Sequence, residues 1–199
     1  MLVLKLFVYS FLSYWFTVLC YMFPWGKHNT DEIPDDFSRV CSVVLKNQCL
    51  YTGVYVLPFL YYPQETCSVV HGLWQIPSMV VLTDVMFFIA HYTMHTKWLY
   101  KRIHSKHHEY QVPIAAGALY AHPVEHIFVN LFSVITPLFL VKAHPTIVVL
   151  WVTLTSVNTV VSHSPVEKDN THGLHHRFRN CNYGAGFMLL DRLFGTYIQ

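Results

Sequence analysis

Long uncharged stretches alternate with short polar ones along this chain of 199 residues. The first uncharged stretch runs from Leu6 to Gly26 and is largely apolar. It has the length of about 20 residues that a helix needs to cross a bilayer. Because no small-residue cleavage pattern follows it, we interpret it as a retained membrane helix rather than as a signal peptide.

The next part of the chain has a less regular pattern. Lys27 to Lys46 carries both acidic and basic residues and is predicted to be a polar connector. Two uncharged runs follow, from Asn47 to Gln64 and from Thr66 to Thr83, and both contain proline. We interpret these two runs as a hairpin rather than as two regular membrane spans.

Three helices are predicted in the second half of the chain. Ser78 to His95 directly follows a proline, which suits a helix start. Val124 to Val141 and Thr146 to Val161 are apolar and joined by a short turn, as is typical of antiparallel neighbours. This hairpin is expected to bring His163 back to the face that carries His104 and His126.

The composition is that of a membrane protein. The chain is 53% hydrophobic and only 12% charged, against roughly 25% charged residues in average soluble domains. The net charge of +2 gives no bulk basic signal, so no nucleic-acid partner is expected. The five cysteines contain no C-x-x-C pair, which leaves a disulfide framework or a zinc ribbon unsupported.

Eight histidines fall in three spaced groups. They are the H-x-x-x-H pair His91 and His95, the H-x-x-H-H motif His104, His107 and His108, and the second such motif His172, His175 and His176. Residues three or four apart share a helix face, so such histidines can converge on one ion. One tetrahedral zinc ion uses only four ligands, so we predict two metals with about four ligands each. His28, His71 and His144 stand alone and are interpreted as ordinary core or surface residues.

A basic segment surrounds the second histidine group. Its cations are Lys97, Lys101, Arg102 and Lys106. By the positive-inside rule this face is cytosolic. The predicted fold is therefore an all-α integral membrane protein with about four membrane helices in hairpins and a cytosolic, histidine-rich helical cap.

One carboxylate lies on the same predicted helix stripe as the first histidine pair. Asp84 precedes His91 by seven residues, and His91 precedes His95 by four. A carboxylate in an apolar helix is unfavourable without a partner. Either Asp84 accepts a hydrogen bond from a ligand histidine or a nearby base, or it makes a polar contact between packed helices.

The types of ligand limit which metals and which reactions the site would support. An all-nitrogen shell without cysteine favours iron, zinc or copper. A site at the end of membrane helices, beside an apolar cavity, suggests a lipid substrate. Two irons, dioxygen and a hydrocarbon chain together suggest oxidation of a C–H bond.

The motifs resemble those of the fatty acid hydroxylase/sterol desaturase superfamily, over roughly Ser78 to Thr196. The segments most similar to its sterol branch, which includes 4-methylsterol oxidases and cholesterol 25-hydroxylases, are Leu99 to Tyr110, Tyr120 to Glu125, His163-Ser164, Asn182-Tyr183 and Asp191 to Thr196. The resemblance implies a division into N-terminal membrane helices with a connector, residues 1–76, and a di-metal catalytic domain, residues 77–199.

The resemblance also implies an activity. It points to a non-haem di-iron enzyme of the endoplasmic reticulum membrane that hydroxylates or desaturates a sterol or fatty acyl lipid with O₂. Its electrons would come from a cytochrome b5-type donor, and zinc could substitute for iron in a histidine-rich site. The metal ligands that it implies are His91, His95, His104, His107, His108, His163, His172, His175 and His176, with His122 and His126 as further candidates. Asp84 and Glu125 would orient ligands.

Two departures from the family pattern keep alternatives open. Gly173 stands where relatives usually carry Asp, and only eight residues separate His163 from His172. The shortened segment favours the alternative of a catalytically inactive metal- or lipid-binding relative. A metal transporter is the other alternative, but it would place ionisable residues along a path at mid-membrane, whereas these histidines gather near helix ends.

Overall fold

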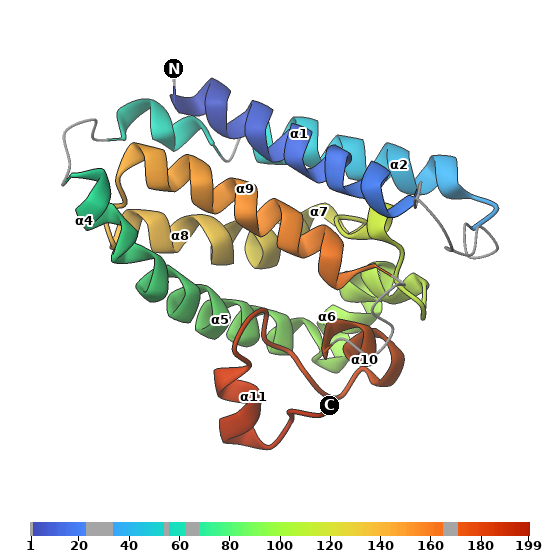
Figure 1. The fold of residues 1–199 in the computed structure, drawn as a ribbon. Coiled ribbons are helices and arrows are strands. Elements are labelled where there is room, and N and C mark those ends of the chain that lie inside the picture. The colour runs from blue at the N-terminus through green and yellow to red at the C-terminus, as the bar shows by residue number, and fades with distance from the viewer. Residues whose placement is uncertain (1, 23–33, 54–55, 63–67, 165–170) are drawn as a thin grey trace.

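The structure is a computed structural model that describes residues 2–22, 34–53, 56–62, 68–164 and 171–199, without the side chains of Val69 and His71. All regular elements in these ranges are helical (Figure 1). They are α1 Leu2–Met22, α2 Phe37–Lys46, η2 Asn47–Thr52, η3 Leu57–Tyr61, α4 Val69–Leu73, α5 Gln75–Met94, α6 Lys97–Arg102, η4 His104–Glu109, η5 Ala115–Gly117, α7 Pro123–Glu125, η6 His126–Leu131, α8 Phe132–Leu140, α9 Pro145–Ser162, α10 Thr171–Phe178 and α11 Leu189–Phe194.

The long helices form a bundle with a helical cap at one end. In Figure 1, α1 and α2 lie on one side of α9, and α8 and α5 lie on the other side. The short helices α6, α10 and α11 gather near the C-terminal end of α5. The helical fold and the histidine-rich cap that the sequence predicts are therefore confirmed.

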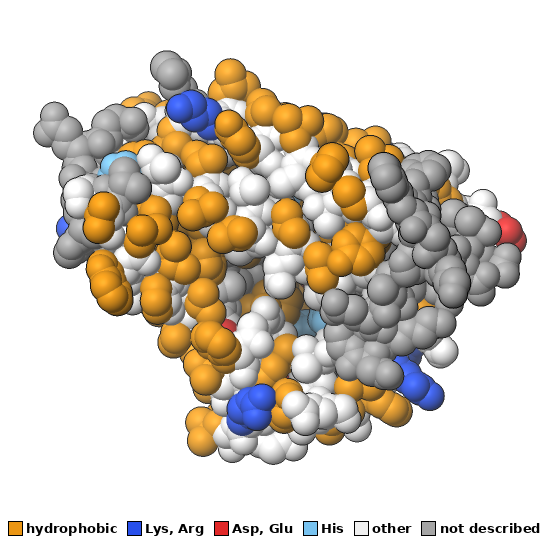
Figure 2. All heavy atoms as spheres, viewed as in Figure 1, with side chains coloured by type: hydrophobic (Ala, Val, Ile, Leu, Met, Phe, Trp, Pro, Cys, Tyr) orange, Lys and Arg blue, Asp and Glu red, His pale blue; other side chains and the backbone are white. Residues whose placement is uncertain are grey.

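Five helical stretches in the described part of the chain are long and apolar enough to cross a membrane. Four of them are Leu2–Tyr21, Gln75–Met94, Pro123–Leu140 and Pro145–Ser162. Many large apolar side chains on these helices are exposed, as expected for surfaces that face lipid. Figure 2 shows hydrophobic side chains covering most of the bundle on the side drawn.

The fifth stretch, Phe37–Tyr61, corrects the prediction of a polar connector up to Lys46. The charged residues in this region lie on one face and at the helix ends. A linear reading of the sequence does not show this arrangement, so no membrane span was predicted there. Val40 and Val44 point into the bundle and are fully buried, while Arg39 pairs with Asp36 and Glu109 at the surface. The helix also continues past Lys46 into the π-helical turns of η2, so the predicted end of the connector at Lys46 does not separate two elements.

Two apolar clusters fill the bundle. The cluster farther from the cap includes Leu6, Phe59, Met79, Leu138 and Ile147. The cluster beside the cap packs Tyr14 of α1 and Val44 of α2 against Ala118, Tyr120 and Val160. Both clusters take residues from either side of residue 76, and the division into two domains there stays a prediction.

The hairpin of α8 and α9 forms as predicted. Its turn is closed by a hydrogen bond from the backbone N–H of Ala143 to the carbonyl of Leu138, 2.9 Å. His144 precedes the first residue of α9, Pro145, and its Nδ1 accepts a hydrogen bond from the backbone N–H of Thr146. This capping satisfies one of the free N–H groups at the helix start and explains a solitary histidine without any metal.

Candidate metal centre

Nine histidines converge in the cap and divide into two adjoining groups that could each hold a metal ion. The five-histidine group consists of His91, His95, His104, His108 and His175. The four-histidine group consists of His107, His163, His172 and His176. Within each group the candidate ligand atoms all lie within 4.8 Å of one another. All nine of these residues are among the metal ligands expected from the sequence.

Each H-x-x-H-H motif contributes to both groups. His104 and His108 are four residues apart on η4 and face the five-histidine group, whereas His107 faces the other one. On α10 the arrangement is reversed, because His172 and His176 share the four-histidine group. The spacing therefore allows one turn of helix to bridge two neighbouring sites.

The nitrogen separations suit metal coordination. In the five-histidine group, the Nε2 atom of His104 lies 3.1 Å from that of His91, 2.9 Å from that of His95 and 3.0 Å from that of His108. Ligand atoms about 2.1 Å from one metal lie about 3.0 Å apart when they subtend a right angle. In the four-histidine group, the Nε2 atom of His163 lies 3.0 Å from that of His172 and 3.4 Å from that of His107.

Backbone carbonyls fix which ring nitrogen carries the proton in four of these histidines. The Nδ1 atoms of His91 and His175 donate to the carbonyls of Tyr183, 2.9 Å, and Cys181, 2.7 Å. The same applies to His163, which donates to Thr159 at 2.8 Å, and to His107, which donates to Tyr120 at 3.2 Å. Since a carbonyl can only accept, each neutral ring presents a bare Nε2 lone pair to its group.

Burial keeps these rings neutral. It lowers the pKa of His107 to about 4, despite the hydrogen bond to Tyr120. Burial, with repulsion from His107, lowers the pKa of His163 to about 3, and burial with repulsion from His95 does the same for His175. Metal ligation requires neutral imidazole, so the groups are ready to bind a cation at neutral pH.

A buried carboxylate faces one of the grouped histidines. Glu125 is 2% exposed, and its Oε1 atom lies 2.9 Å from Nδ1 of His104. The two atoms are in contact, but the angles fall outside those of a regular hydrogen bond. A proton on Nδ1 of His104 would face this carboxylate and leave Nε2 free for a metal.

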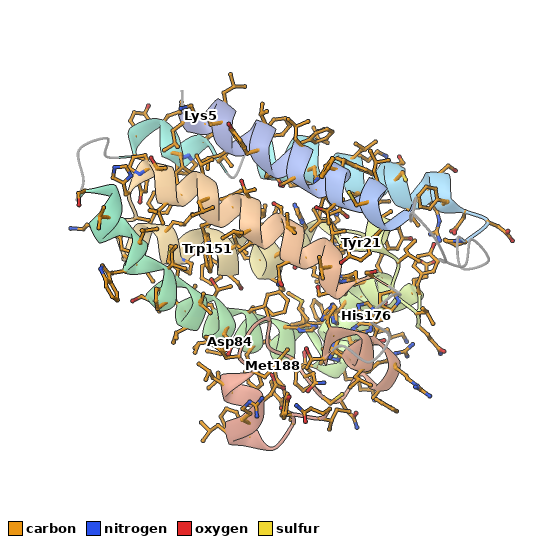
Figure 3. All side chains as sticks on the ribbon, viewed as in Figure 1. Lys5, Tyr21, Asp84, Trp151, His176 and Met188 are labelled. Atoms are coloured by element: carbon orange, nitrogen blue, oxygen red, sulfur yellow. The ribbon has the colours of Figure 1, made fainter. Side chains whose placement is uncertain are left out.

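Asp84 does not contact a histidine. Its Oδ1 atom accepts hydrogen bonds from the backbone N–H groups of Ala185, Gly186 and Met188, and its Oδ2 atom accepts one from Leu189 at 2.8 Å. Figure 3 shows Asp84 of α5 beside Met188 of the C-terminal loop. Asp84 therefore anchors the loop that follows Tyr183, and the alternative in which it contacts a ligand histidine directly is wrong.

A second buried carboxylate, which the sequence interpretation did not assign, completes this anchor. Asp191 accepts from the backbone N–H groups of Tyr183, 2.8 Å, and Gly184, 2.7 Å. A Cβ atom at Gly184 would lie 2.9 Å from Oδ1 of Asp84 and 3.0 Å from Oδ2 of Asp191. Only glycine lets the loop pass between both carboxylates. The Asn-Tyr-Gly and Asp-x-x-x-Gly-Thr motifs were the available signal for this role.

Two of the predicted ligands belong to neither group. His122 precedes Pro123 and caps α7, with its Nδ1 atom accepting from the backbone N–H of Val124 at 3.2 Å. His126 lies on η6, and its Nε2 atom is 3.0 Å from Oγ1 of Thr52. The His-Pro sequence that opens α9 opens α7 as well, which indicates a capping role. The expectation that these two histidines complete the metal shell is therefore corrected.

The cap is accessible from the surface. Figure 2 shows a hollow between the bundle and the C-terminal segment, with histidine visible at its base. Within their groups, His107 and His172 each keep 8% of their surface exposed. The fold and this site together define an all-helical membrane protein with a buried, histidine-lined site beside a hydrophobic surface.

The chain belongs to the fatty acid hydroxylase family, whose sequence profile matches residues 76–196. It is 32% identical over 185 residues to fatty acid hydroxylase domain-containing protein 2 of Homo sapiens, covering 86% of this chain and 55% of that protein. No solved structure matches the chain.

Other relatives carry the names of different lipid reactions. The chain is 36% identical over 138 residues to the very-long-chain aldehyde decarbonylase GL1-11 of Oryza sativa subsp. japonica, covering 61% of this chain and 52% of that protein. It is 33% identical over 138 residues to methylsterol monooxygenase 2-2 of Arabidopsis thaliana, with the same coverages of 61% and 52%. The chain thus spans about half the length of these curated relatives.

Proposed function

We propose that this chain is a membrane-bound, non-haem di-iron oxidoreductase that hydroxylates or desaturates a sterol or fatty acyl lipid with O₂. Membership of the fatty acid hydroxylase family supports this proposal. The relatives named as a decarbonylase and a methylsterol monooxygenase support an enzyme that acts on lipids.

One observation carries the metal part of the proposal. Nine buried or mostly buried histidines form two adjoining groups, and carbonyl partners leave bare lone pairs facing inward in both. Lone pairs about 3 Å apart repel one another unless a cation lies between them. Both ring nitrogens of His176 are buried without a partner among the described residues, which a metal would also relieve.

Iron fits the five-histidine group better than zinc does. Protein zinc sites are almost always four-coordinate when structural, and catalytic ones use three protein ligands. Five nitrogen donors with near-right-angle separations suit a metal of coordination number five or six, such as iron(II). Zinc would substitute for iron in the four-histidine group, where the affinity order favours it.

The protein's own groups hold and orient the site. Iron on nitrogen ligands would supply the reduction of O₂ and the oxidation of the lipid. Nine of the proposed ligands, His91, His95, His104, His107, His108, His163, His172, His175 and His176, would hold it. Glu125 would fix the ring of His104, and Asp84 would act through the loop that supplies the carbonyl for His91.

The proposed orientation in the membrane follows from the positive charges around the cap. Cations on α6 and η4, including Lys101, Arg102 and Lys106, would place the cap on the cytosolic face of the endoplasmic reticulum membrane. A cytochrome b5-type donor would deliver electrons there. The lipid substrate would approach from the bilayer.

Product formation tests this proposal. The purified protein would be supplied with ¹⁸O₂, a cytochrome b5 electron-transfer system, and in turn a methylsterol, a fatty acid and a fatty aldehyde. A product with one ¹⁸O atom would indicate hydroxylation, and a new double bond without ¹⁸O would indicate desaturation. No product from protein that holds two irons would favour the alternative, an inactive metal- or lipid-binding relative.

The alternative rests on the two departures in the sequence. Gly173 replaces the usual Asp, and the shortened segment after Ser164 lies largely outside the described residues, at positions 165–170. Even so, His163 and His172 lie on either side of that segment and reach the same group, with Nε2 atoms 3.0 Å apart. The short segment therefore leaves the ligand set intact, which favours an active enzyme.

A further inference from the structure

A cavity of about 80 Å³ lies inside the bundle, between α1, η2, η6, α8 and α9. A single water needs roughly 10–15 Å³ on such a measure, so the space can take part of a larger molecule. Apolar side chains make up fewer than half of its lining residues, and most of the others carry a hydroxyl or an amide group. No described metal-group histidine lines it.

Three polar side chains in its wall have unused hydrogen-bonding capacity. Asn130 makes no side-chain hydrogen bond to any described residue, and neither does the hydroxyl of Thr159. The Oε1 atom of Gln48 accepts from Trp15, 2.7 Å, but its amide nitrogen donates to no described group. None of these atoms is fully enclosed by described residues. In a membrane helix bundle, free polar groups of this kind favour a polar ligand.

The polar wall lies at the cap end of the cavity. Thr159 supplies the carbonyl that holds His163, and His126 directly follows Glu125, which faces His104. The opposite end is formed by apolar residues such as Val56, Ile135 and Val152, which belong to the apolar cluster far from the cap. There, the indole of Trp151, labelled in Figure 3, donates to the carbonyl of Val134 and ties α9 to α8.

The lining also limits the charge of the ligand. It contains no Lys, Arg, Asp or Glu among its described residues. A carboxylate or phosphate group would therefore lose its water without gaining a countercharge. A neutral hydroxyl or carbonyl oxygen could instead accept from the amides of Gln48 and Asn130.

We propose that this cavity binds the neutral, oxygen-bearing end of a lipid, with Asn130 and Gln48 contacting the oxygen and the hydrocarbon extending away from the cap. This inference deepens the proposed function and rests on it for the identity of the ligand as substrate. In this orientation, the carbons that neighbour the oxygen lie nearer the histidine groups than the rest of the hydrocarbon does. A long-chain alcohol or aldehyde and a sterol share this chemistry.

Binding to the metal-loaded protein in nanodiscs tests the proposal without requiring turnover. The probes are hexadecanol, cholesterol, hexadecane and hexadecanoate, each competing with tritiated hexadecanol. Hexadecanol or cholesterol should compete at least tenfold better than hexadecane. Hexadecanoate, which is negatively charged at neutral pH, should compete poorly. The better of the two oxygenated probes identifies the source of the oxygen.

Two variants of the same helical segment sharpen this test. Asn130→Leu should weaken binding of the preferred alcohol roughly tenfold and leave hexadecane unchanged, because one hydrogen bond is lost. Phe128→Leu is the control, since Phe128 is 60% exposed on the outer surface. Metal content should be unchanged in both variants, so loss of binding and loss of metal are distinguishable.

Photo-crosslinking checks the orientation. A hexadecanol carrying a diazirine next to the hydroxyl should label the peptide with Thr159, and one with the diazirine at the chain end should label the peptide with Val56. Equal labelling by both probes, or an equal preference for alkane and alcohol, would overturn the proposal. Alcohol binding by a protein that holds no metal would support this lipid site and would contradict the di-iron function instead.

Discussion

The two histidine groups differ in what holds them. In the five-histidine group, His91 and His175 donate to carbonyls of the C-terminal loop, at Tyr183 and Cys181. In the four-histidine group, His163 donates to Thr159 within α9, and His107 donates to Tyr120 beside the bundle core. The first group therefore depends on a loop that is itself anchored by two buried aspartates, whereas the second depends on the membrane helices. Damage to the loop and damage to the bundle should affect the groups separately.

Removing one ligand from each group should have the largest effect. His175→Ala should release metal from the five-histidine group, and His176→Ala from the four-histidine group. Activity should fall by more than the roughly 10–100-fold that losing an outer partner of a ligand causes. Metal content of each purified variant, with circular dichroism as the check on folding, measures the separation. Loss of both metals in both variants would show that the groups act as one unit.

Disturbing the loop anchor should come next. Asp84→Asn removes one acceptor from a carboxylate that takes four backbone N–H groups, which should loosen the Tyr183 carbonyl. Metal affinity of the five-histidine group should fall roughly 10-fold, with the four-histidine group little changed.

Competition with a chelator would measure both affinities in Asp84→Asn. Asn130→Leu is a suitable control, because it also changes a polar residue of the membrane helices but lies outside the anchor. Equal weakening of both groups by Asp84→Asn would contradict the assignment of the loop to one group.

Acid should affect the two groups alike. Both contain histidines whose pKa is lowered by burial, to about 4 for His107 and to about 3 for His163 and His175. As the pH falls below about 6.5, the unfolded chain takes up protons that the native chain cannot accept until these lower values. Stability of the metal-free protein should therefore decline between pH 6.5 and pH 4.

Each such histidine contributes a slope of about 1.4 kcal/mol per pH unit within that window. Melting temperatures of metal-depleted protein in detergent, from pH 7.5 downward, would show it. A melting temperature that is constant or rises towards pH 5 would rule out buried neutral histidines. Bound metal should move the decline to lower pH, since ligands then resist protonation.

The surface ion pair of α2 should matter least. Arg39 contacts Glu109 at 2.6 Å, but both side chains are about half exposed, and water screens such pairs. Arg39→Ala should change the melting temperature by no more than about 3 °C and leave metal content unchanged. Since Glu109 also accepts from the hydroxyl of Tyr120, loss of metal from the four-histidine group alone would show that this network supports His107.

The four-residue spacings match the structure, because His104 shares a group with His108, and His172 with His176. Spacing did not predict the division into two groups, because the i, i+3 pairs of both H-x-x-H-H motifs separate, and His163 was expected only from the family resemblance. It could not assign His122 and His126, whose sequence separation fits a ligand pair but whose side chains cap a helix and contact Thr52. The partner of Asp84 was also beyond sequence reasoning, because the loop that it binds lies about 100 positions later in the chain.

The membrane helices show the same limit. Apolar runs predicted four of the spans, because these runs are more hydrophobic than ordinary helices. The span beginning at Phe37 was missed because its charged residues dominate a linear sequence window. Only the tertiary fold shows that Arg39 lies at the surface while Val40 and Val44 fill the core.

Metal analysis of the intact chain tests the central claim most directly. Protein purified anaerobically from membranes supplied with iron-57 would be measured for metal content and by Mössbauer spectroscopy, beside the double variant His107→Ala/His175→Ala, which removes one ligand from each group. We expect two irons per chain, in two nitrogen-rich environments, and their loss in the variant. A well-folded protein without stoichiometric metal would contradict it and leave a lipid-binding relative of these enzymes as the better description.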